Sequence, residues 1–390
     1  MDSILDFLES SRASFLADLA ALVNVDCGTY NKAGVDWVGE WIGARCHEWG
    51  WEAERLPQTE YGDCWIARLR GDGAGRLMLV GHTDTVYPDG TAAGRPMRFD
   101  GPKILGPGTC DMKGGLLVGM YALRALQNTG FRNFSELVFF FNSEEEVGSP
   151  VSRPLYSPVV REMDAALVLE SARANGDIVS ARKGVGEYTL RVKGKAAHAG
   201  VEPEKGASAV LELAHRIVAL HALNSIAPGV TLNAGVIGGA TRPNVVPEEA
   251  WVTVDVRAVD PAGAEAISAA LAELAARAST VPRTQVEIAG YFGHAPMAKT
   301  PAVALLAKWA KEAARDLGFE MGDAATGGAS DANAIAGLGV PVLDGLGPVG
   351  GLDHSPDEYI EADSLAPRTA LLAGSIRGIL ERREKLAEVR

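Results

Sequence analysis

The sequence has few cysteines, and their spacing favours neither a disulfide framework nor a metal-binding pair. Only four occur in 390 residues, and they are scattered along the chain: Cys27, Cys46, Cys64 and Cys110. No two are separated by two residues, as the cysteines of a zinc ribbon would be. We therefore predict that all four are free thiols buried in the protein.

The chain also lacks long apolar runs and an excess of basic residues. No run approaches the roughly 20 apolar residues that a membrane-spanning helix needs. Lys and Arg number 37 against 50 Asp and Glu, which gives a formal net charge of −13. A chain this acidic would repel a phosphate backbone. We therefore expect neither a nucleic acid nor a membrane among its partners.

The N-terminus does not have the features of a signal peptide. The segment MDSILDFLESSRASFLADLA has acidic residues where a signal peptide has Lys or Arg, and its apolar residues recur at helical spacing. We interpret it as the first helix of a cytoplasmic protein. A content of 47% hydrophobic and 22% charged residues excludes a disordered chain, and the length suggests two or three domains.

Short apolar runs alternate with amphipathic helices in the first part of the chain. The runs at 77–80, 137–141 and 167–169 predict buried strands, with a helix over 114–126 between the first two. Apolar strands separated by helices are typical of an α/β sheet with helices on both faces.

The pattern changes after about residue 182, where half-exposed strands and helices follow in the order β-α-β-β-α-β. This is the element order of a ferredoxin-like domain. The α/β pattern then returns. The sequence therefore predicts a large mixed-sheet α/β domain, formed by 1–182 and 294–390, with a ferredoxin-like domain inserted at 183–293.

Polar residues directly follow each of the three apolar runs. His82 and Asp84 follow the first, Glu144-Glu145-Glu146 follows the second, and Glu170 ends the third. Ligand sites in open α/β sheets lie outside the carboxyl ends of the strands. Two further candidates come from elsewhere: Asp111 precedes the helix that begins near 114, and His354 lies in a late Gly-rich loop.

Five of these residues form a set of imidazoles and carboxylates without a thiolate: His82, Asp111, Glu146, Glu170 and His354. This set suits zinc or another divalent metal in an open, catalytic site. Because five ligands are too many for one tetrahedral ion, two ions that share a carboxylate fit better. Asp84 could accept the other N–H of the His82 imidazole and fix its tautomer.

Each residue has a structural alternative when taken alone. His82 could be a core histidine, the three Glu a solvated face, and Asp111 an ordinary helix cap. The segment Gly345–Gly350 matches G-x-G-x-x-G, but its Pro and the lack of a following helix argue against a dinucleotide site. Taken together, the strand ends favour the metal site.

Eight blocks of the sequence resemble, in order, a family of dinuclear zinc hydrolases: GHTDTVY, GPGTCDMKGG, NSEEEVGS, VLES, GKAAHAGVEPEKG, RPNVVPEEAWVTVDVR, TGGASDA and DHSPDEY. The family comprises acetylornithine deacetylase, succinyl-diaminopimelate desuccinylase, aminoacylase and glutamate carboxypeptidase. The likeness is greatest to bacterial glutamate carboxypeptidases that cleave folate-type acyl-glutamates. The resemblance implies that the α/β domain is a metallopeptidase catalytic domain. It also implies that the inserted domain is a lid and dimerisation domain.

The resemblance also implies roles for the residues at the strand ends. It implies that His82 and Glu170 bind one zinc ion, that Glu146 and His354 bind the other, and that Asp111 bridges them. Cobalt or manganese could substitute for zinc. Glu145, just before a ligand in its block, would be the catalytic base. The Asp111–Met112 peptide bond would be cis.

The inserted domain gains a function through the same resemblance. His198 matches a lid histidine that reaches the active site of a neighbouring subunit and supports the oxyanion. Asn244 and Arg257 match residues that hold the carboxylate of the substrate, to which a planar guanidinium is suited. Gly327 and Gly328 would let the substrate backbone approach. The structural alternatives are a polar cap for His198, a surface ion pair for Arg257 and a plain turn for the glycines.

The expected reaction is metal-dependent hydrolysis of an amide bond that releases an amino acid with a free carboxylate, above all glutamate from an N-acyl or peptidyl glutamate. The expected substrate is thus a small N-acyl amino acid or a dipeptide. The main alternative is an N-acyl amino-acid deacylase, either a deacetylase or a desuccinylase. A remote alternative is a non-catalytic binding scaffold. If His198 acts in a neighbouring subunit, the working unit is a homodimer formed through the lid.

Overall fold

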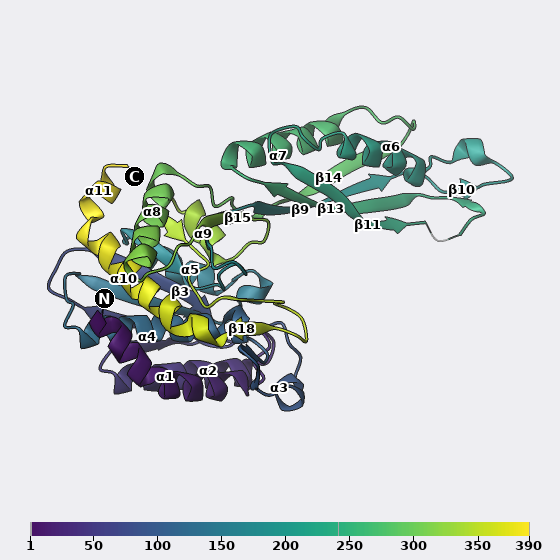
Figure 1. Ribbon diagram of the computed structural model, residues 1–390. Helices are drawn as coiled ribbons and strands as arrows, with labels where there is room; N and C mark the ends of the chain where they lie inside the picture. Colours follow the sequence, from purple (N-terminus) through teal and green to yellow (C-terminus); the bar gives the residue numbers. More distant parts are fainter. Residues whose placement is uncertain (1, 241, 390) are drawn as a thin grey trace. The chain divides into compact units, whose positions relative to one another are not determined.

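The computed structural model describes residues 2–240 and 242–389, and the chain divides into two compact units (Figure 1). The larger unit comprises Met1–Ser180, Lys299–Ala325 and Ser330–Arg390. The smaller unit comprises Ala181–Ala298 and Thr326–Ala329. The smaller unit thus interrupts the larger one twice along the chain.

The larger unit is built on a six-stranded mixed sheet. In spatial order its strands are β1 (Glu52–Leu56), β2 (Cys64–Arg70), β6 (Glu136–Asn142), β3 (Arg76–His82), β7 (Ala165–Val168) and β16 (Val342–Leu343). The neighbours from β6 to β16 run parallel, whereas β1 and β2 pair antiparallel. The three apolar runs predicted as strands therefore lie next to one another as β3, β6 and β7, and the α/β fold class is confirmed.

The central strands are apolar because both of their faces are covered. Phe139 and Phe141 stack on one face of β6 at 4.1 Å between ring centroids, within the main core of the unit. Phe140 points to the opposite face and makes an edge contact with Tyr156 of α5 (Ser152–Val160). A continuous apolar run, instead of an alternating one, is what a strand buried on both faces requires.

The larger unit also contains helices, several of which contact strands of this sheet. They are α1 (Asp2–Val23), α2 (Lys32–Glu48), α3 (Thr91–Gly94), α4 (Gly114–Asn128), α5, α8 (Pro301–Asp316), α9 (Asp331–Gly337), α10 (Leu365–Glu381) and α11 (Arg383–Ala387). Helix α10 packs against α1, α4 and α8, and α5 packs against α9. The predicted helix over 114–126 corresponds to α4.

Short strands flank the turn of Asp111 and the loop of His354. A four-stranded sheet has the order β17 (Gly350–Gly351), β18 (Tyr359–Glu361), β5 (Lys103–Leu105) and β4 (Arg98–Asp100). The turn that contains Asp111 follows β5, and the loop that contains His354 connects β17 to β18. A further pair is formed by β8 (Ile178–Arg182) and β15 (Asp323–Thr326).

The smaller unit is a four-stranded antiparallel sheet with two helices on one face (Figure 1). Along the chain its main elements are β9 (Gly184–Lys193), α6 (Ala209–His221), β11 (Thr231–Gly239), β13 (Glu249–Ala258), α7 (Pro261–Ala276) and β14 (Gln285–His294). The spatial order β11-β13-β9-β14 is that of a ferredoxin-like sheet. Burial alternates along β9 and β13, since only the helix-covered face is apolar. A short pair, β10 (Ala197–His198) and β12 (Val245–Val246), extends from it.

All four cysteines are free and buried, which confirms the prediction from their spacing. Among residues 2–240 and 242–389, no helix is long and apolar enough to cross a membrane. The cytoplasmic location inferred from the sequence stays a prediction.

Candidate metal centre

Three neighbouring strands bring their polar residues to one edge of the sheet. His82 is the last residue of β3 and pairs in register with Asn142, the last residue of β6. A single helical turn, Glu145–Val147, follows β6, and Glu170 lies two residues beyond the end of β7. Because β6, β3 and β7 are adjacent and parallel, His82, Glu145, Glu146 and Glu170 come from the same carboxyl edge.

Asp111 reaches this edge from an irregular turn and does not cap a helix. It lies between β5 and α4, and no side chain caps the N-terminus of α4. The Asp111–Met112 peptide bond is cis, as the family resemblance implied. The alternative that Asp111 is an ordinary helix cap is therefore wrong.

The carboxylate of Asp111 lies between two imidazoles. The Nε2 of His82 is 2.9 Å from Asp111 Oδ1, and the Nε2 of His354 is 3.0 Å from Asp111 Oδ2. On the first side, Glu170 Oε1 lies 3.7 Å from His82 Nε2, and on the second, Glu146 Oε2 lies 3.3 Å from His354 Nε2. The five residues thus form two pairs that share one aspartate.

These distances and one buried oxygen atom fit a metal centre. Around a tetrahedral ion with bonds of about 2.0–2.2 Å, neighbouring ligand atoms lie about 3.3–3.6 Å apart, close to the separations seen here. His82, Asp111 and Glu146 can each offer one ligand atom, all within 4.8 Å of one another. The Oε1 atom of Glu146 is buried without a hydrogen-bond partner. A buried anionic oxygen that lacks a donor suits a cation.

The electrostatics of the centre are dominated by these pairs. Burial alone would lower the pKa of His82, but its hydrogen bonds to Asp111 and Asp84 raise that pKa well above the usual value. Hydrogen bonds to Asp111 and Glu146 raise the pKa of His354 to about 11. Burial opposes ionisation of Asp111, yet the two imidazoles hold its pKa below the usual range. Because a metal ion binds only the neutral form of an imidazole, metal binding by these histidines would compete with their protonation.

Glu145 lies beside these pairs and is half-buried. Burial raises the pKa of its carboxyl well above the usual value; the charge of His82 opposes this rise and that of Glu170 adds to it. A raised pKa makes a carboxylate a better proton acceptor, which suits a general base.

Asp84 connects His82 to the Glu145–Val147 turn. The Nδ1 of His82 lies 3.0 Å from the backbone oxygen of Asp84 and 3.3 Å from its Oδ1. The Asp84 carboxylate also accepts hydrogen bonds from the hydroxyl of Thr29 at 2.6 Å and from the backbone N–H groups of Glu145 and Glu146 at 3.1 and 3.3 Å. The contact with His82 was predicted from the sequence, whereas the contact with Thr29 was not.

Two buried acids near the centre, Glu144 and Asp331, make contacts that the sequence did not indicate. Glu144 accepts hydrogen bonds from the hydroxyls of Ser143 and Ser152, each at 2.6 Å, so it holds the start of α5. Asp331 accepts from Asn142 and Ser149, each at 2.6 Å. The partners of Asp331 are distant from it in the sequence, and those of Glu144 form no recognised local motif with it. The sequence alone therefore could not indicate these contacts.

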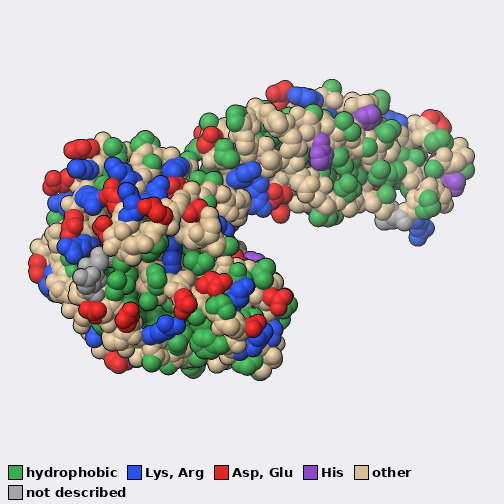
Figure 2. Space-filling view, in the orientation of Figure 1, with side chains coloured by type: hydrophobic (Ala, Val, Ile, Leu, Met, Phe, Trp, Pro, Cys, Tyr) green, Lys and Arg blue, Asp and Glu red, His purple; other side chains and the backbone are tan. Residues whose placement is uncertain are grey.

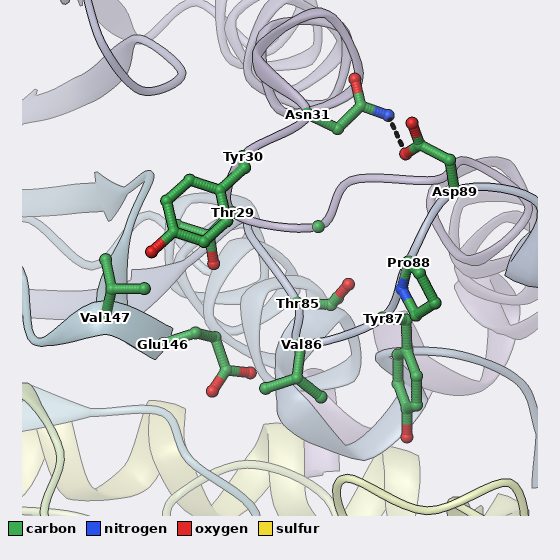
Figure 3. Close-up of a pocket in the computed structure, with 11 residues that line it drawn as sticks. Thr29, Tyr30, Asn31, Thr85, Val86, Tyr87, Pro88, Asp89, Glu146 and Val147 are labelled. Carbon is green, nitrogen blue, oxygen red and sulfur yellow. Dashed lines mark hydrogen bonds between the residues drawn. The ribbon is translucent and has the colours of Figure 1, made fainter. Parts of the chain in front are cut away.

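A pocket of about 490 Å³ opens next to Glu146 (Figure 3). Its lining includes the rings of Tyr30 and Tyr87 and the apolar side chains of Val86 and Val147. Tyr30 is 78% exposed, and its ring lies 6.1 Å from that of Tyr61. Among the described residues that line this pocket there is no Lys or Arg.

The remaining predicted site residues belong to the smaller unit. His198 and Asn244 are exposed and close together, since the N–H of Ala199 donates to the backbone oxygen of Asn244 at 3.0 Å. Arg257 pairs with Asp255, with Nη2 to Oδ2 at 2.8 Å. This is the surface ion pair considered above as the alternative for Arg257.

Gly327 and Gly328 lie beside two arginines within the same unit. Arg257 Nη1 donates to the backbone oxygen of Gly327 at 3.3 Å, and Arg182 Nη1 donates to that of Gly328 at 3.1 Å. The structure thus brings Arg257 and the two glycines together. His198 and Asn244 form a separate group around β10 and β12.

Comparison with known sequences identifies relatives that match most of the chain. The model of peptidase family M20/M25/M40 matches residues 78–378. Carboxypeptidase G2 of Pseudomonas sp. (strain RS-16) is 30% identical over 371 residues, which are 91% of this chain and 86% of the relative. Succinyl-diaminopimelate desuccinylase of Stenotrophomonas maltophilia (strain R551-3) is 26% identical over 83% of this chain and 88% of that protein.

Solved structures share the fold. Aminopeptidase PepT from Bacillus cereus ATCC 10987 matches with a TM-score of 0.79 and 24% identity, over 94% of this chain and 98% of that one. The M20 family metallo-carboxypeptidase Sso-CP2 from Sulfolobus solfataricus matches with a TM-score of 0.72 and 17% identity, over 94% and 99% of the two chains. At these identities the likeness concerns the fold alone.

Proposed function

This chain belongs to peptidase family M20/M25/M40 and is a hydrolase of amide bonds, and we propose that it is a metal-dependent carboxypeptidase that releases glutamate from N-acyl or peptidyl glutamate. The observation that carries the proposal is the carboxylate of Asp111 between the imidazoles of His82 and His354. One acid flanked by two histidine–glutamate pairs is the donor set that two neighbouring ions require.

Two zinc ions would occupy the two halves of this set. His82 and Glu170 would hold one ion, Glu146 and His354 the other, and Asp111 both. Bound ions of this kind lower the pKa of a water molecule and polarise the carbonyl of the substrate. The chain itself fixes the orientation of the His82 ring. Asp84 contacts His82 Nδ1, so that Nε2 is the ring nitrogen that faces Asp111.

Glu145 would move the proton in the reaction. Its carboxylate would take a proton from the attacking water and pass it to the nitrogen of the departing amino acid. Two features support this role: burial raises the pKa of Glu145, and Asp84 accepts the Glu145 backbone N–H, which fixes the turn. The base then starts from a fixed position beside the predicted ligands.

Residues of the smaller unit would recognise the substrate. We propose that Arg257 and Asn244 bind the free carboxylate, that His198 supports the developing oxyanion, and that Gly327 and Gly328 allow close approach of the substrate backbone. These roles derive from the family resemblance. The ion pair with Asp255 means that a substrate carboxylate would share or replace an existing partner of Arg257.

The pocket next to Glu146 would take the acyl side of the substrate. Its lining includes two tyrosine rings and the carboxylates of Asp89 and Glu146, without a described Lys or Arg. An uncharged aromatic acyl group suits this surface, whereas a succinyl group would bring a further carboxylate close to Asp89 in a pocket lined by no described cation. We therefore expect N-benzoylglutamate to be cleaved with a kcat/KM at least about tenfold above that of N-succinylglutamate.

Product identification by mass spectrometry tests the proposed function. Metal-loaded protein is offered a mixed library of N-acyl amino acids and dipeptides, together with matched C-terminal amides. We expect free glutamate as the main product and cleavage of the amides at least about 100-fold slower, because a site built for a carboxylate rejects its neutral analogue.

Other products would contradict specific parts of the proposal. Release of acetyl or succinyl groups from other amino acids would favour the deacylase alternative. Equal cleavage of acids and amides would exclude recognition of the carboxylate. No cleavage of any compound by protein with two bound ions would contradict the carboxypeptidase assignment.

We also propose that the protein is a homodimer formed through the smaller unit. Edge strand β11 exposes Val236 and Ile237, and the adjacent helix α6 exposes Val210, Leu211 and Val218, the last at 74%. Figure 2 shows hydrophobic side chains along the visible face of this unit. An apolar edge strand with unpaired backbone groups is suited to pair with a second copy.

Replacing Ile237 with lysine should convert the dimer to a monomer, because each interface would bury two uncompensated charges. Light scattering after size-exclusion chromatography gives the mass directly. The matched control is Phe99→Lys, which places the same charge at an exposed apolar position of the larger unit. A wild-type protein that is already monomeric and fully active would exclude both the dimer and a role for His198 in a neighbouring subunit.

A further inference from the structure

Glu358 is a buried acid to which no role has been given so far. It is 1% exposed and lies four residues after His354, in the loop that leads into β18. Its Oε1 accepts the backbone N–H groups of Cys110 and Asp111 at 2.8 and 3.0 Å. Its Oε2 accepts the backbone N–H of Gly108 at 2.9 Å and the hydroxyl of Tyr87 at 2.7 Å.

This group, the Glu358 cluster, comprises Glu358, Tyr87, Gly108, Cys110 and Asp111. All four donors come from segments about 250 residues away in the sequence. The cluster also reaches the loop of His354, because the hydroxyl of Tyr87 lies 2.8 Å from the backbone oxygen of Ser355 and shares its one hydrogen between the two acceptors. The cluster therefore joins the turn of Asp111 to the loop of His354.

The turn at Asp111 needs such an anchor. Asp111 has non-helical backbone angles (φ −122°, ψ 93°) and belongs to neither β5 nor α4, so no regular ladder fixes its orientation. The direction of its carboxylate depends on the direction of its own backbone. A charged oxygen that accepts backbone N–H groups makes hydrogen bonds stronger than those between neutral groups.

We propose that Glu358 is the positioning residue that sets the spacing between Asp111 and His354, and thereby the metal affinity of the centre. It would touch neither metal nor substrate. It acts through the backbone of Asp111 on one side and through Tyr87 and the His354 loop on the other. The inference rests on the proposed function, since it requires that Asp111 and His354 are metal ligands.

The cluster could also have a purely structural role, in which Glu358 stabilises the fold without affecting the metal. The two roles differ in what is lost when one oxygen is changed. Glu358→Gln keeps the volume of the side chain but turns an N–H donor toward backbone N–H groups that need an acceptor. A positioning role predicts loss of metal affinity in protein that is still folded, whereas a structural role predicts loss of stability alone.

The experiment compares wild type, Glu358→Gln, Tyr87→Phe and a control, Glu136→Gln. Glu136 is a buried acid at the opposite end of β6 and pairs with Arg68 and Arg70 at 2.8 and 2.7 Å. Zinc affinity is measured by competition with a chromophoric chelator. Hydrogen exchange of the amides of Gly108, Cys110 and Asp111 is measured in the metal-free proteins.

Glu358→Gln should bind zinc about 10–100-fold more weakly than wild type, as is usual when a residue that orients metal ligands is lost. Tyr87→Phe should lose about threefold to tenfold, because it removes one donor. The amide hydrogens of Gly108, Cys110 and Asp111 should exchange faster in both variants. Glu136→Gln should change neither the zinc affinity nor this exchange.

Two results would overturn the inference: zinc affinity of Glu358→Gln within twofold of wild type, or an equal loss in Glu136→Gln. If Glu358→Gln does not fold, unchanged affinity and exchange in Tyr87→Phe overturn it instead. If wild type itself binds no zinc, the proposed function fails before this inference is tested, so the two failures are distinguishable.

Discussion

Replacing Glu145 with glutamine should lower kcat by about 10²–10⁴-fold while the bound metal stays unchanged, since this is the usual contribution of a general base. Glutamine has nearly the same shape but cannot accept a proton from water. The backbone N–H of Glu145 would still donate to Asp84, so the turn that also carries Glu146 should keep its conformation. The loss should therefore appear in kcat and not in metal content.

The measurement pairs steady-state kinetics with metal analysis by mass spectrometry. Glu40→Gln is the matched control, because Glu40 is exposed and forms a surface ion pair with Arg55, away from the predicted metal ligands. A Glu145→Gln protein that retains a tenth of the wild-type rate would show that another group is the base.

Replacing Asp111 with asparagine should have the second large effect and should act on the metal itself. The asparagine side chain has one oxygen, so it can face only one of the imidazoles of His82 and His354 with an acceptor. It also removes the negative charge between two groups that each lie within 3.0 Å of it. We expect at least one ion to be lost and activity to fall by more than the roughly 10–100-fold typical of residues that only orient ligands.

Metal content after dialysis, measured together with kcat/KM, checks this prediction. Asp357→Asn is the control, because Asp357 is an exposed aspartate in the same loop as His354. Full metal content in Asp111→Asn would contradict the bridging role. Loss of metal in the control would show that the whole loop, and not the shared carboxylate, is sensitive to charge.

The part of the fold that carries the centre was predictable from the sequence because its strands are buried on both faces. Continuous apolar runs in β3, β6 and β7 are a strong local signal, and the polar residues that follow them identify the carboxyl edge of the sheet. The five clustered residues were all named from these strand ends, from the turn before α4 and from the late loop.

Other elements gave a weaker signal. Strand β2 was not predicted, because Arg68 and Arg70 interrupt its apolar run in the antiparallel part of the sheet. Helix α5 contains Pro158 beyond its first turn, a position where proline disfavours a helix. In both elements, tertiary contacts outweigh local preference.

The polar residues around the centre could not be found in this way. Thr29, Asp331 and Glu358 each meet their partners across more than 50 residues, and none belongs to a local spacing that indicates its role. The family resemblance helps little here, because the blocks that contain Asp331 and Glu358 give their residue types but not their contacts. Only the structure shows that Glu358 accepts hydrogen bonds from the backbone of the turn that contains Asp111.

The most direct measurement of the central claim is a zinc titration of metal-free protein, in which bound ions and hydrolysis of an N-acyl glutamate are followed together. The arrangement of Asp111 between two histidine–glutamate pairs predicts that activity rises to a plateau at two ions per chain and that a chelator removes metal and activity together. A plateau at one ion would contradict the shared role of Asp111. Full hydrolysis by protein without metal would contradict the metal centre as a whole.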